Sequence, residues 1–146
     1  MSEAFAVDSS CMVAAVCSWH EQHTAAFAEI ERRLTRGERM VVPIHALTEA
    51  YSVLTRLPAP HRLSCRDAWA VIEANFVHSR MVVALDASEQ VKLLARLAAD
   101  AWGGGRTYDA VIAASATRGK AAELLTFNPR HFEPALDGIS IVVPCA

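Results

Sequence analysis

Phe5-Ala6-Val7-Asp8-Ser9-Ser10 is a short apolar run that ends in one carboxylate and two hydroxyls, and an apolar helical stretch follows it from Cys11 to Cys17. This arrangement predicts a buried strand that turns directly into a helix. In open α/β sheets, ligands bind beyond the carboxyl ends of the strands. Asp8 is therefore the first candidate site residue. A purely structural role is also open, because Asp and Ser are the preferred caps of a helix N-terminus.

The rest of the chain alternates between short apolar runs and helical patterns. Further strands are expected at Met40–Val42, Met81–Leu85, Leu124–Leu125 and Ile139–Val143. Amphipathic spacing and cap signals predict helices over His20–Arg36, Pro43–Leu57, the stretch after Ser64, the stretch after Asp86, and Tyr108–Arg118. We therefore expect one α/β domain over residues 1–146, with about five short strands in a mostly parallel sheet and helices on both faces.

Two details of the later helices follow from local pattern alone. Val91, Leu94 and Leu97 recur at helical spacing and are expected to form a stripe that faces the core. Thr107 directly precedes Tyr108 and is expected to cap the helix that begins there.

Length and composition describe an ordinary globular chain. It has 146 residues, of which 53% are hydrophobic and 21% charged, enough to bury one core. Its formal charge of −2 provides no general basic surface, so any contact with RNA has to be local. The four cysteines form no C-x-x-C pair, which argues against a structural zinc site and a disulfide framework. With no signal peptide and no membrane-length apolar run, we expect a cytoplasmic protein without a membrane partner.

Two further carboxylates lie in predicted helices. The helical position of Glu49 groups it with polar residues, so periodicity favours a solvated side chain. However, Ala46 and Ala50 continue the apolar surface past it, so this helix can be covered on both sides. Asp109 lies in the first turn of Tyr108–Arg118, where the helix dipole stabilises a carboxylate. Its neighbours at helical spacing are small and apolar, which favours a semi-buried carboxylate that needs a cation.

The fourth candidate is Asn128, which follows the predicted strand at Leu124–Leu125 as Asp8 follows the first strand. Because the carboxyl ends of parallel strands meet at one edge of a sheet, both residues belong to the same edge. The Asn-Pro pair at this point is also an ordinary turn signal.

Four short motifs, in order along nearly the whole chain, resemble the PIN-domain ribonucleases and in particular the VapC-like toxins of bacterial toxin–antitoxin pairs. They are Val-Asp-Ser-Ser at 7–10, a Glu at 49, Tyr-Asp-Ala-Val-Ile-Ala-Ala at 108–114, and Leu-Leu-Thr-Phe-Asn-Pro-Arg-His-Phe at 124–132. Each motif is weak by itself, but four in register are much more specific.

The resemblance implies a metal-dependent endoribonuclease that hydrolyses RNA phosphodiester bonds with Mg²⁺ or Mn²⁺. Asp8, Glu49 and Asp109 would hold the metal, and Asn128 would stand at the fourth catalytic position. That position is often Asp in the family. Asn can coordinate through its carbonyl oxygen but adds no charge, so a second metal would be held more weakly. Mg²⁺ and Mn²⁺ prefer oxygen ligands and keep several waters, so a few carboxylates can hold the ion beside a substrate phosphate.

Further residues and partners follow from the same resemblance. Ser9 and Thr126 match the hydroxyl positions beside the family's acidic site, and Arg130 and His131 flank it and are candidates for contact with RNA phosphate. The expected partners are the RNA substrate, a cognate antitoxin protein and a second copy of the chain. The homodimer is also expected because helices that already have a core-facing stripe carry further apolar residues. Our expected buried positions in the homodimer interface are Tyr51, Val53 and Trp69.

Two alternatives remain open. One is a binding or regulatory module on the same fold, in which Asn128 marks a weakened metal site and the protein acts by contact alone. The other is a phosphotransfer or phosphatase domain with Asp8 as the nucleophile. The second is disfavoured because Ser9-Ser10 follow Asp8 where a haloacid-dehalogenase-like motif repeats the Asp.

Overall fold

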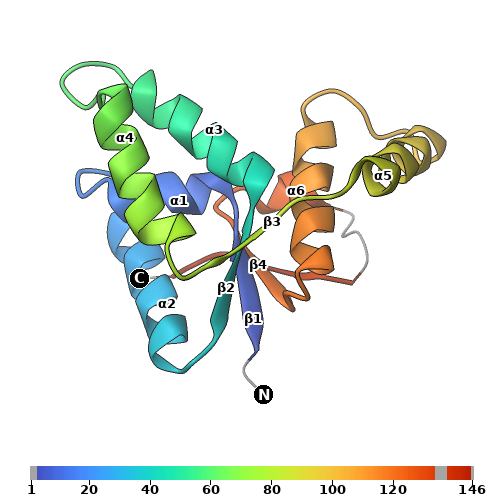
Figure 1. Cartoon of the computed structure of the whole chain (residues 1–146), viewed down its shortest axis with the longest axis horizontal. Helices are drawn as coiled ribbons and strands as arrows, with labels where there is room; N and C mark the ends of the chain where they lie inside the picture. Colours follow the sequence, from blue (N-terminus) through green and yellow to red (C-terminus); the bar gives the residue numbers. More distant parts are fainter. Residues whose placement is uncertain (1–2, 134–137, 146) are drawn as a thin grey trace.

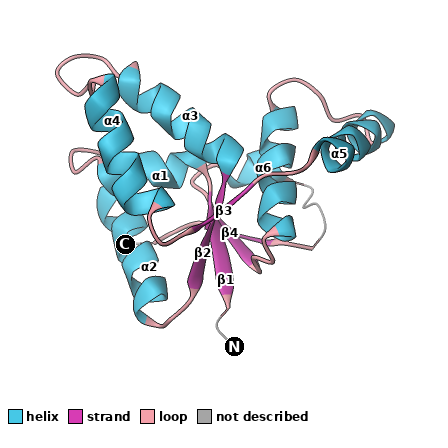
Figure 2. Cartoon of the chain, in the orientation of Figure 1, coloured by secondary structure: helices cyan, strands magenta, loops and turns pink. Residues whose placement is uncertain are grey.

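The structure, a computed structural model, describes residues 3–133 and 138–145. This part of the chain contains five strands and six α-helices, with two α-helices after each of the first three strands (Figures 1 and 2). The strands are β1 (Ala4–Val7), β2 (Arg39–Pro43), β3 (Met81–Val83), β4 (Glu123–Leu125) and β5 (Ser140–Val142). The helices are α1 (Ser9–Val16), α2 (His23–Thr35), α3 (Ile44–Thr55), α4 (Cys65–Ile72), α5 (Ala87–Ala99) and α6 (Arg106–Arg118). A π-helical turn, Glu73–Val77, extends α4, and a short 3₁₀ helix, Pro129–Phe132, follows β4.

The five strands form one sheet in the order β3-β2-β1-β4-β5, and every neighbouring pair is parallel. The chain adds β2 and β3 on one side of β1 and then adds β4 and β5 on the other side. The strand order therefore reverses between β1 and β4. In open α/β sheets a crevice forms at such a reversal, beyond the carboxyl ends of the strands. Asp8 follows β1 and Asn128 follows β4, so both residues flank this crevice.

Strand β1 is the centre of the sheet and of the core. All four of its residues are buried. In the register of the sheet, Ala6 pairs with Val41 of β2 on one side and with Leu124 of β4 on the other. Figure 1 shows α1 and α2 on one face of the sheet and α6 on the opposite face. A strand covered on both faces has no polar side, which explains the continuous apolar run at 4–7 and confirms the predicted α/β class.

Helix α5 packs against α6 through a small apolar cluster of its own, and Figure 1 shows it projecting from the body of the domain. Its buried residues are Leu93 and Leu97. The expected core-facing stripe is wrong for two of its three members, since Val91 is 66% exposed and Leu94 is 47% exposed. The helix carries apolar side chains on two sides, and spacing alone does not say which side meets α6.

The start of α6 also differs from the expectation. The helix begins at Arg106, with Gly105 at the N-cap position and no capping side chain, so Thr107 is not the cap. Gly104 has a φ of +63°, and its backbone oxygen accepts a hydrogen bond from Thr107 N at 3.1 Å. The glycine turn therefore starts the helix before Thr107.

An ion-pair network lies at the amino ends of the strands, opposite the candidate site. Arg33 of α2 is buried and lies 2.6 Å from Glu29, 2.7 Å from Glu123 and 3.2 Å from Glu38. Its guanidinium also lies 5.4 Å from the centre of the Phe5 ring. The network joins α2 to the amino ends of β1, β2 and β4. Among the helices of 3–133 and 138–145, none has the length and apolar character that crossing a membrane demands.

Candidate active site

A pocket of about 460 Å³ opens beyond the carboxyl ends of β1 and β4. Asp8, Glu49, Asp109 and Asn128, the four residues singled out in the sequence, all line it. They come from four different places: the end of β1, the middle of α3, the first turn of α6 and the turn after β4. Its other lining residues are Ser9, Gly105, Arg106, Tyr108 and His131. The fold thus gathers polar side chains that are far apart in the sequence.

Asp8 is almost completely buried, with 4% of its surface exposed. Its Oδ1 accepts hydrogen bonds from the Cys11 backbone N at 3.0 Å and from the Ser10 hydroxyl at 2.7 Å. Its Oδ2 accepts a hydrogen bond from the Thr126 hydroxyl at 2.5 Å. Asp8 therefore caps α1 and also lines the pocket, so its structural and functional roles do not exclude each other. Burial raises the pKa of this carboxyl, although the hydrogen bonds oppose the shift.

Two hydroxyls tie the turn after β1 to the turn after β4. The Thr126 hydroxyl donates its proton to Asp8 and accepts a hydrogen bond from the Asn128 backbone N at 2.9 Å. The Ser10 hydroxyl donates to Asp8 and accepts from the Phe127 backbone N at 3.0 Å. Each hydroxyl has one proton to donate and lone pairs left to accept. Both therefore hold Asn128 and its loop in a fixed place beside Asp8.

Glu49 lies at the rim of the pocket and is partly exposed. Its Oε1 accepts a hydrogen bond from the Ser9 hydroxyl at 3.2 Å, and its Oε2 lies 3.7 Å from His45 Nε2. Ala46 and Ala50, on its two sides along α3, are buried because this helix contacts both α1 and α6. The helix is therefore covered on both sides. Periodicity favours a fully solvated Glu49, whereas the structure places it between two covered surfaces.

Asp109 is half-buried in the first turn of α6. Its Oδ2 lies 3.8 Å from His131 Nδ1. Burial is the largest cause of the raised pKa of Asp109. The charges of Glu49 and Asp8 raise this pKa further, while His131 lowers it. The three carboxylates are thus near enough to disfavour one another's negative charge.

The donor set of the pocket fits a hard divalent cation. Three carboxylates and one amide offer oxygen ligands, and a cation among them removes the repulsion between their charges. Within the ranges that the structure describes, no three His, Cys, Asp or Glu side chains form a ready-made metal cage. Mg²⁺ suits such an open arrangement because it keeps several of its waters.

Arg106 is the single Lys or Arg among the residues that line this pocket. Its guanidinium lies 4.0 Å from the centre of the Trp102 ring, and its Nη2 donates to the backbone oxygen of Glu133. Its Nε is buried and has no partner in the part of the chain described. A fixed guanidinium at the rim of an acidic pocket suits a phosphate. Arg106 is not among the residues singled out from the sequence, because the predicted helix begins at Tyr108 and leaves Arg106 outside it, whereas α6 begins at Arg106.

Only one of the two residues expected to touch RNA lies at the pocket. His131 lines it, whereas Arg130 is exposed and does not line it. Both belong to the 3₁₀ helix Pro129–Phe132, in which successive side chains point in different directions. The expectation for Arg130 therefore has no support from the geometry.

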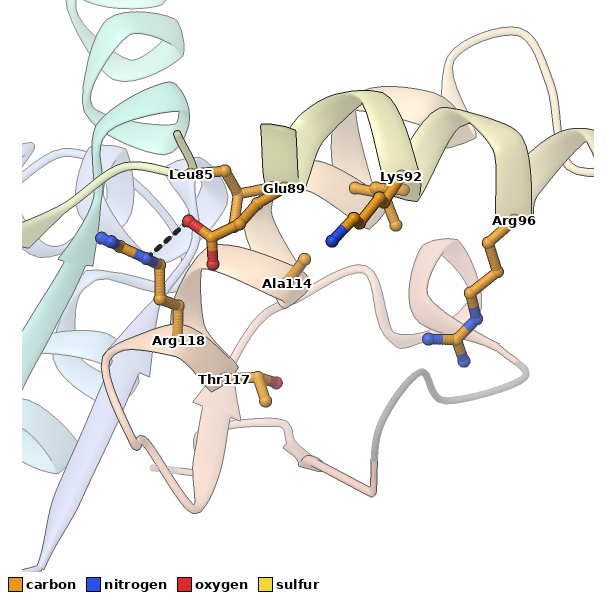
Figure 3. A pocket seen from close by; sticks show the side chains of 8 residues that line it. Leu85, Glu89, Lys92, Arg96, Ala114, Thr117 and Arg118 are labelled. Carbon is orange, nitrogen blue, oxygen red and sulfur yellow. Dashed lines mark ion pairs between the residues drawn. The ribbon is translucent and has the colours of Figure 1, made fainter. Parts of the chain in front are cut away.

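A separate pocket of about 360 Å³ lies between α5 and α6 (Figure 3). It is bounded by the last turn of α6, whereas Asp109 lies in the first turn of that helix. Glu89 and Arg118 form an ion pair of 2.8 Å across it, drawn as the dashed line in Figure 3. None of the four candidate residues lines it. This pocket is therefore not part of the candidate site.

Comparison with known sequences agrees with this fold. The sequence model of the PIN domain matches residues 5–135. The chain belongs to the PIN domain family. It is similar to ribonuclease VapC40 of Mycobacterium tuberculosis, at 40% identity over 128 residues, covering 88% of this chain and 89% of that protein. It is also similar to ribonuclease VapC27 of the same species, at 32% identity over 130 residues, covering 89% and 88%.

Solved structures agree with the fold. The sarcin-ricin loop cleaving toxin VapC20 of Mycobacterium tuberculosis superposes with a TM-score of 0.66 at 17% identity, covering 92% of this chain and 98% of that one. VapBC2 of Rickettsia felis, solved with a DNA fragment from its promoter, gives a TM-score of 0.68 at 14% identity, covering 96% and 98%. VapBC-1 of nontypeable Haemophilus influenzae gives 0.66 at 16% identity, covering 96% and 97%. Identities this low support the fold alone.

Proposed function

We propose that this chain is a metal-dependent endoribonuclease and the toxin of a toxin–antitoxin pair. The observation that carries the proposal is the meeting of three carboxylates and Asn128 in one pocket, at the point where the strand order of a PIN-domain sheet reverses. The similarity to two proteins named ribonuclease VapC supports the same activity.

Asp8, Glu49 and Asp109 are the residues that would hold a divalent ion, Mg²⁺ or Mn²⁺. When bound, such an ion supplies Lewis-acid activation of the phosphate and of the attacking water. The chain's own residues keep these oxygens in place. Thr126 fixes one oxygen of Asp8, and the Ser9 hydroxyl orients Glu49.

Substrate RNA has to bring a phosphate toward three negative side chains. Arg106 offsets that charge from the rim, where its stack on Trp102 and its bond to the Glu133 backbone limit its motion. His131 lines the pocket beside Asp109 and supplies a second polar contact for the phosphate. Neither residue has to react covalently, because water is the nucleophile in hydrolysis.

The fourth position determines how strongly a second ion can bind. Asn128 offers a carbonyl oxygen without charge, so a second ion is held more weakly than by a carboxylate. This neutral residue is the observation that favours the alternative of a module that acts by contact alone. The two functions make opposite predictions for cleavage of RNA.

The proposed partners are an antitoxin protein and a second copy of the chain. Two of the solved structures of similar fold are those of VapBC2 and VapBC-1, which supports a protein partner for this chain. Exposed Val91 and Leu94 on α5 provide an apolar surface suited to a homodimer. Of the interface positions expected from the sequence, Trp69 is exposed, while Tyr51 and Val53 are partly buried against the core. Light scattering of wild type and of Leu94→Glu and Trp69→Glu tests the dimer and its surface, and a monomeric wild type at micromolar concentration contradicts it.

The activity is tested by incubating end-labelled single-stranded RNA with the purified chain, free of antitoxin. We expect fragments in Mg²⁺ or Mn²⁺, none in chelator, and a rate at least about a hundredfold lower for Asp109→Asn. Full-length RNA under every condition would support the contact-only module.

A further inference from the structure

A second hollow, of about 320 Å³, adjoins the active-site pocket on the α3 side. The two share Ser9, Glu49 and Tyr108 in their linings. The second hollow adds His45, Ser52, Val53 and Arg56. A substrate strand that reaches the carboxylates can therefore continue directly into this second hollow.

Tyr108 forms the boundary between the two hollows. Its ring lies parallel to that of His45, with an interplanar angle of 2° and a centroid distance of 5.1 Å. Tyr108 is nevertheless 54% exposed, although it is a large aromatic residue in the first turn of a core helix. The stack fixes the orientation of the ring and leaves much of its surface to solvent. An exposed ring in a fixed orientation is a stacking platform for a base of single-stranded nucleic acid.

Arg56 supplies a cation at the far side of this platform. It is exposed at the end of α3, and its side chain makes no ion pair or hydrogen bond within the described ranges. Its guanidinium is free to pair with an anion that enters the hollow. An aromatic platform beside a free guanidinium is the combination with which proteins hold a base and its phosphate.

The two hollows differ in charge and therefore in what they can bind. The active-site pocket contains three carboxylates, which suit a cation. Among its lining residues, the second hollow has one carboxylate, Glu49, which lies at the shared boundary. It also has the basic side chains His45 and Arg56. We propose that the second hollow binds the nucleotide of the RNA substrate next to the cleaved bond, with its base on Tyr108 and its phosphate on Arg56. This inference rests on the proposed ribonuclease function.

The test uses a short single-stranded RNA that wild type cleaves, bound in chelator and followed by fluorescence anisotropy. Tyr108→Ala should weaken binding by about tenfold or more, while Tyr108→Phe, which keeps the ring, should bind like wild type. In Mn²⁺, Tyr108→Ala should raise KM and leave kcat nearly unchanged. Arg56→Ala should also weaken binding and flatten the dependence on salt by roughly one phosphate contact, and Arg56→Lys should restore that dependence.

A base-by-base scan connects the platform to one nucleotide. RNAs that lack a single base are bound to wild type and to Tyr108→Ala. Wild type should lose affinity at one position next to the cleavage site, and this loss should disappear in Tyr108→Ala. Phe27→Ala is the matched control, since Phe27 is 50% exposed and also contacts a His ring, at 5.6 Å from His23. Arg66→Ala is the control for Arg56, because Arg66 is an exposed arginine that lines neither hollow.

The outcomes separate this inference from the function on which it rests. If wild type cleaves RNA but the missing-base penalty is the same in Tyr108→Ala, the nucleotide subsite is wrong and the ribonuclease function stands. If both aromatic variants, at Tyr108 and at Phe27, weaken binding equally, the effect is not specific and the subsite is also wrong. If wild type cleaves no RNA, the proposed function itself fails. If binding of an acidic peptide, and not of RNA, depends on Tyr108 and Arg56, the hollow is a protein-docking surface.

Discussion

The Thr126 hydroxyl lies 2.5 Å from Oδ2 of Asp8, although 118 residues separate them in the sequence. Both side chains are buried, and the contact joins the turn after β1 to the turn after β4. The same hydroxyl accepts the backbone N–H of Asn128. One threonine thus orients one candidate metal ligand and fixes the backbone of the residue at the fourth position.

Thr126→Val keeps the size of the side chain and removes the hydroxyl. It leaves a carboxylate oxygen and a backbone N–H without their partner, which should cost about 1 to 3 kcal/mol of unfolding free energy. We also expect a roughly tenfold or greater loss of RNA cleavage, because Asp8 is no longer held. Urea unfolding and cleavage rates measure the two effects. Thr126→Ser keeps the donor, and equal losses in both variants would contradict the role of the hydroxyl.

Asp109→Asn should stabilise the metal-free protein although it lowers the rate of cleavage. It removes a half-buried negative charge that burial and two neighbouring carboxylates disfavour. In chelator, the variant should therefore have a higher Tm than wild type. Mn²⁺ should raise the Tm of wild type more than that of the variant, because an ion that binds the folded state stabilises it. Equal increases in Tm with Mn²⁺ would show that Asp109 is not a ligand.

Arg33→Met should lower stability without affecting the site. Burial raises the pKa of Glu29, but hydrogen bonds and charge from Arg33 and Arg32 outweigh this effect, so the pKa is lowered overall. Removing the buried guanidinium leaves its carboxylates poorly compensated and should cost about 3 kcal/mol. Arg36 provides the control: it pairs with Glu38 of the same network, but its own side chain is 57% exposed, so Arg36→Met should cost less than about 1 kcal/mol.

The same network makes the free energy of unfolding depend on pH in a predictable direction. A carboxylate whose pKa is lowered by folding stabilises the protein above its unfolded value, near 4.5 for Glu29, and this contribution is lost as the pH falls through the folded value. The difference in unfolding free energy between wild type and Arg33→Met should therefore be constant above about pH 6 and shrink below pH 4.5. A difference that grows in acid would contradict the network. Cleavage at neutral pH, per folded molecule, should be unchanged.

Arg106→Gln should raise KM for RNA by roughly ten- to a hundredfold and leave kcat within a few-fold, because a charged hydrogen bond to phosphate is lost. The salt dependence of binding should flatten by about one phosphate contact. Arg130→Gln is the matched control and should behave like wild type, since Arg130 does not line the pocket. An effect of Arg130 equal to that of Arg106 would favour the sequence-based expectation over the geometry.

The sequence predicts a site residue correctly when the direction of its strand alone determines where the residue lies. Residues at the carboxyl ends of parallel strands share an edge, so the proximity of Asp8 and Asn128 follows from the order of strands and helices alone. Helical periodicity is less informative. It groups Glu49 with solvated residues because it cannot represent a helix covered on two sides, and it selects Val91 and Leu94 over Leu93 because α5 is apolar on more than one side.

Arg106 and Tyr108 show a second limit of prediction from the sequence. Their roles depend on where the turn at 103–105 directs the start of α6, and on partners from the α5–α6 loop and α3 that no local pattern identifies. Arg130 and His131 are adjacent in sequence, and only the 3₁₀ turn distinguishes the one that lines the pocket.

The most direct measurement is the rate of RNA cleavage as a function of Mn²⁺ concentration for wild type, Asn128→Asp and Asp109→Asn. Wild type should be inactive without the ion, and its cleavage rate should saturate as the Mn²⁺ concentration rises. Asn128→Asp should reach half-maximal rate at a lower Mn²⁺ concentration with unchanged cleavage positions, because it adds a charge at the fourth position. Asp109→Asn should remain at least about a hundredfold slower at every concentration tested. Cleavage that persists in chelator, or three identical Mn²⁺ curves, would contradict a metal-dependent site in this pocket.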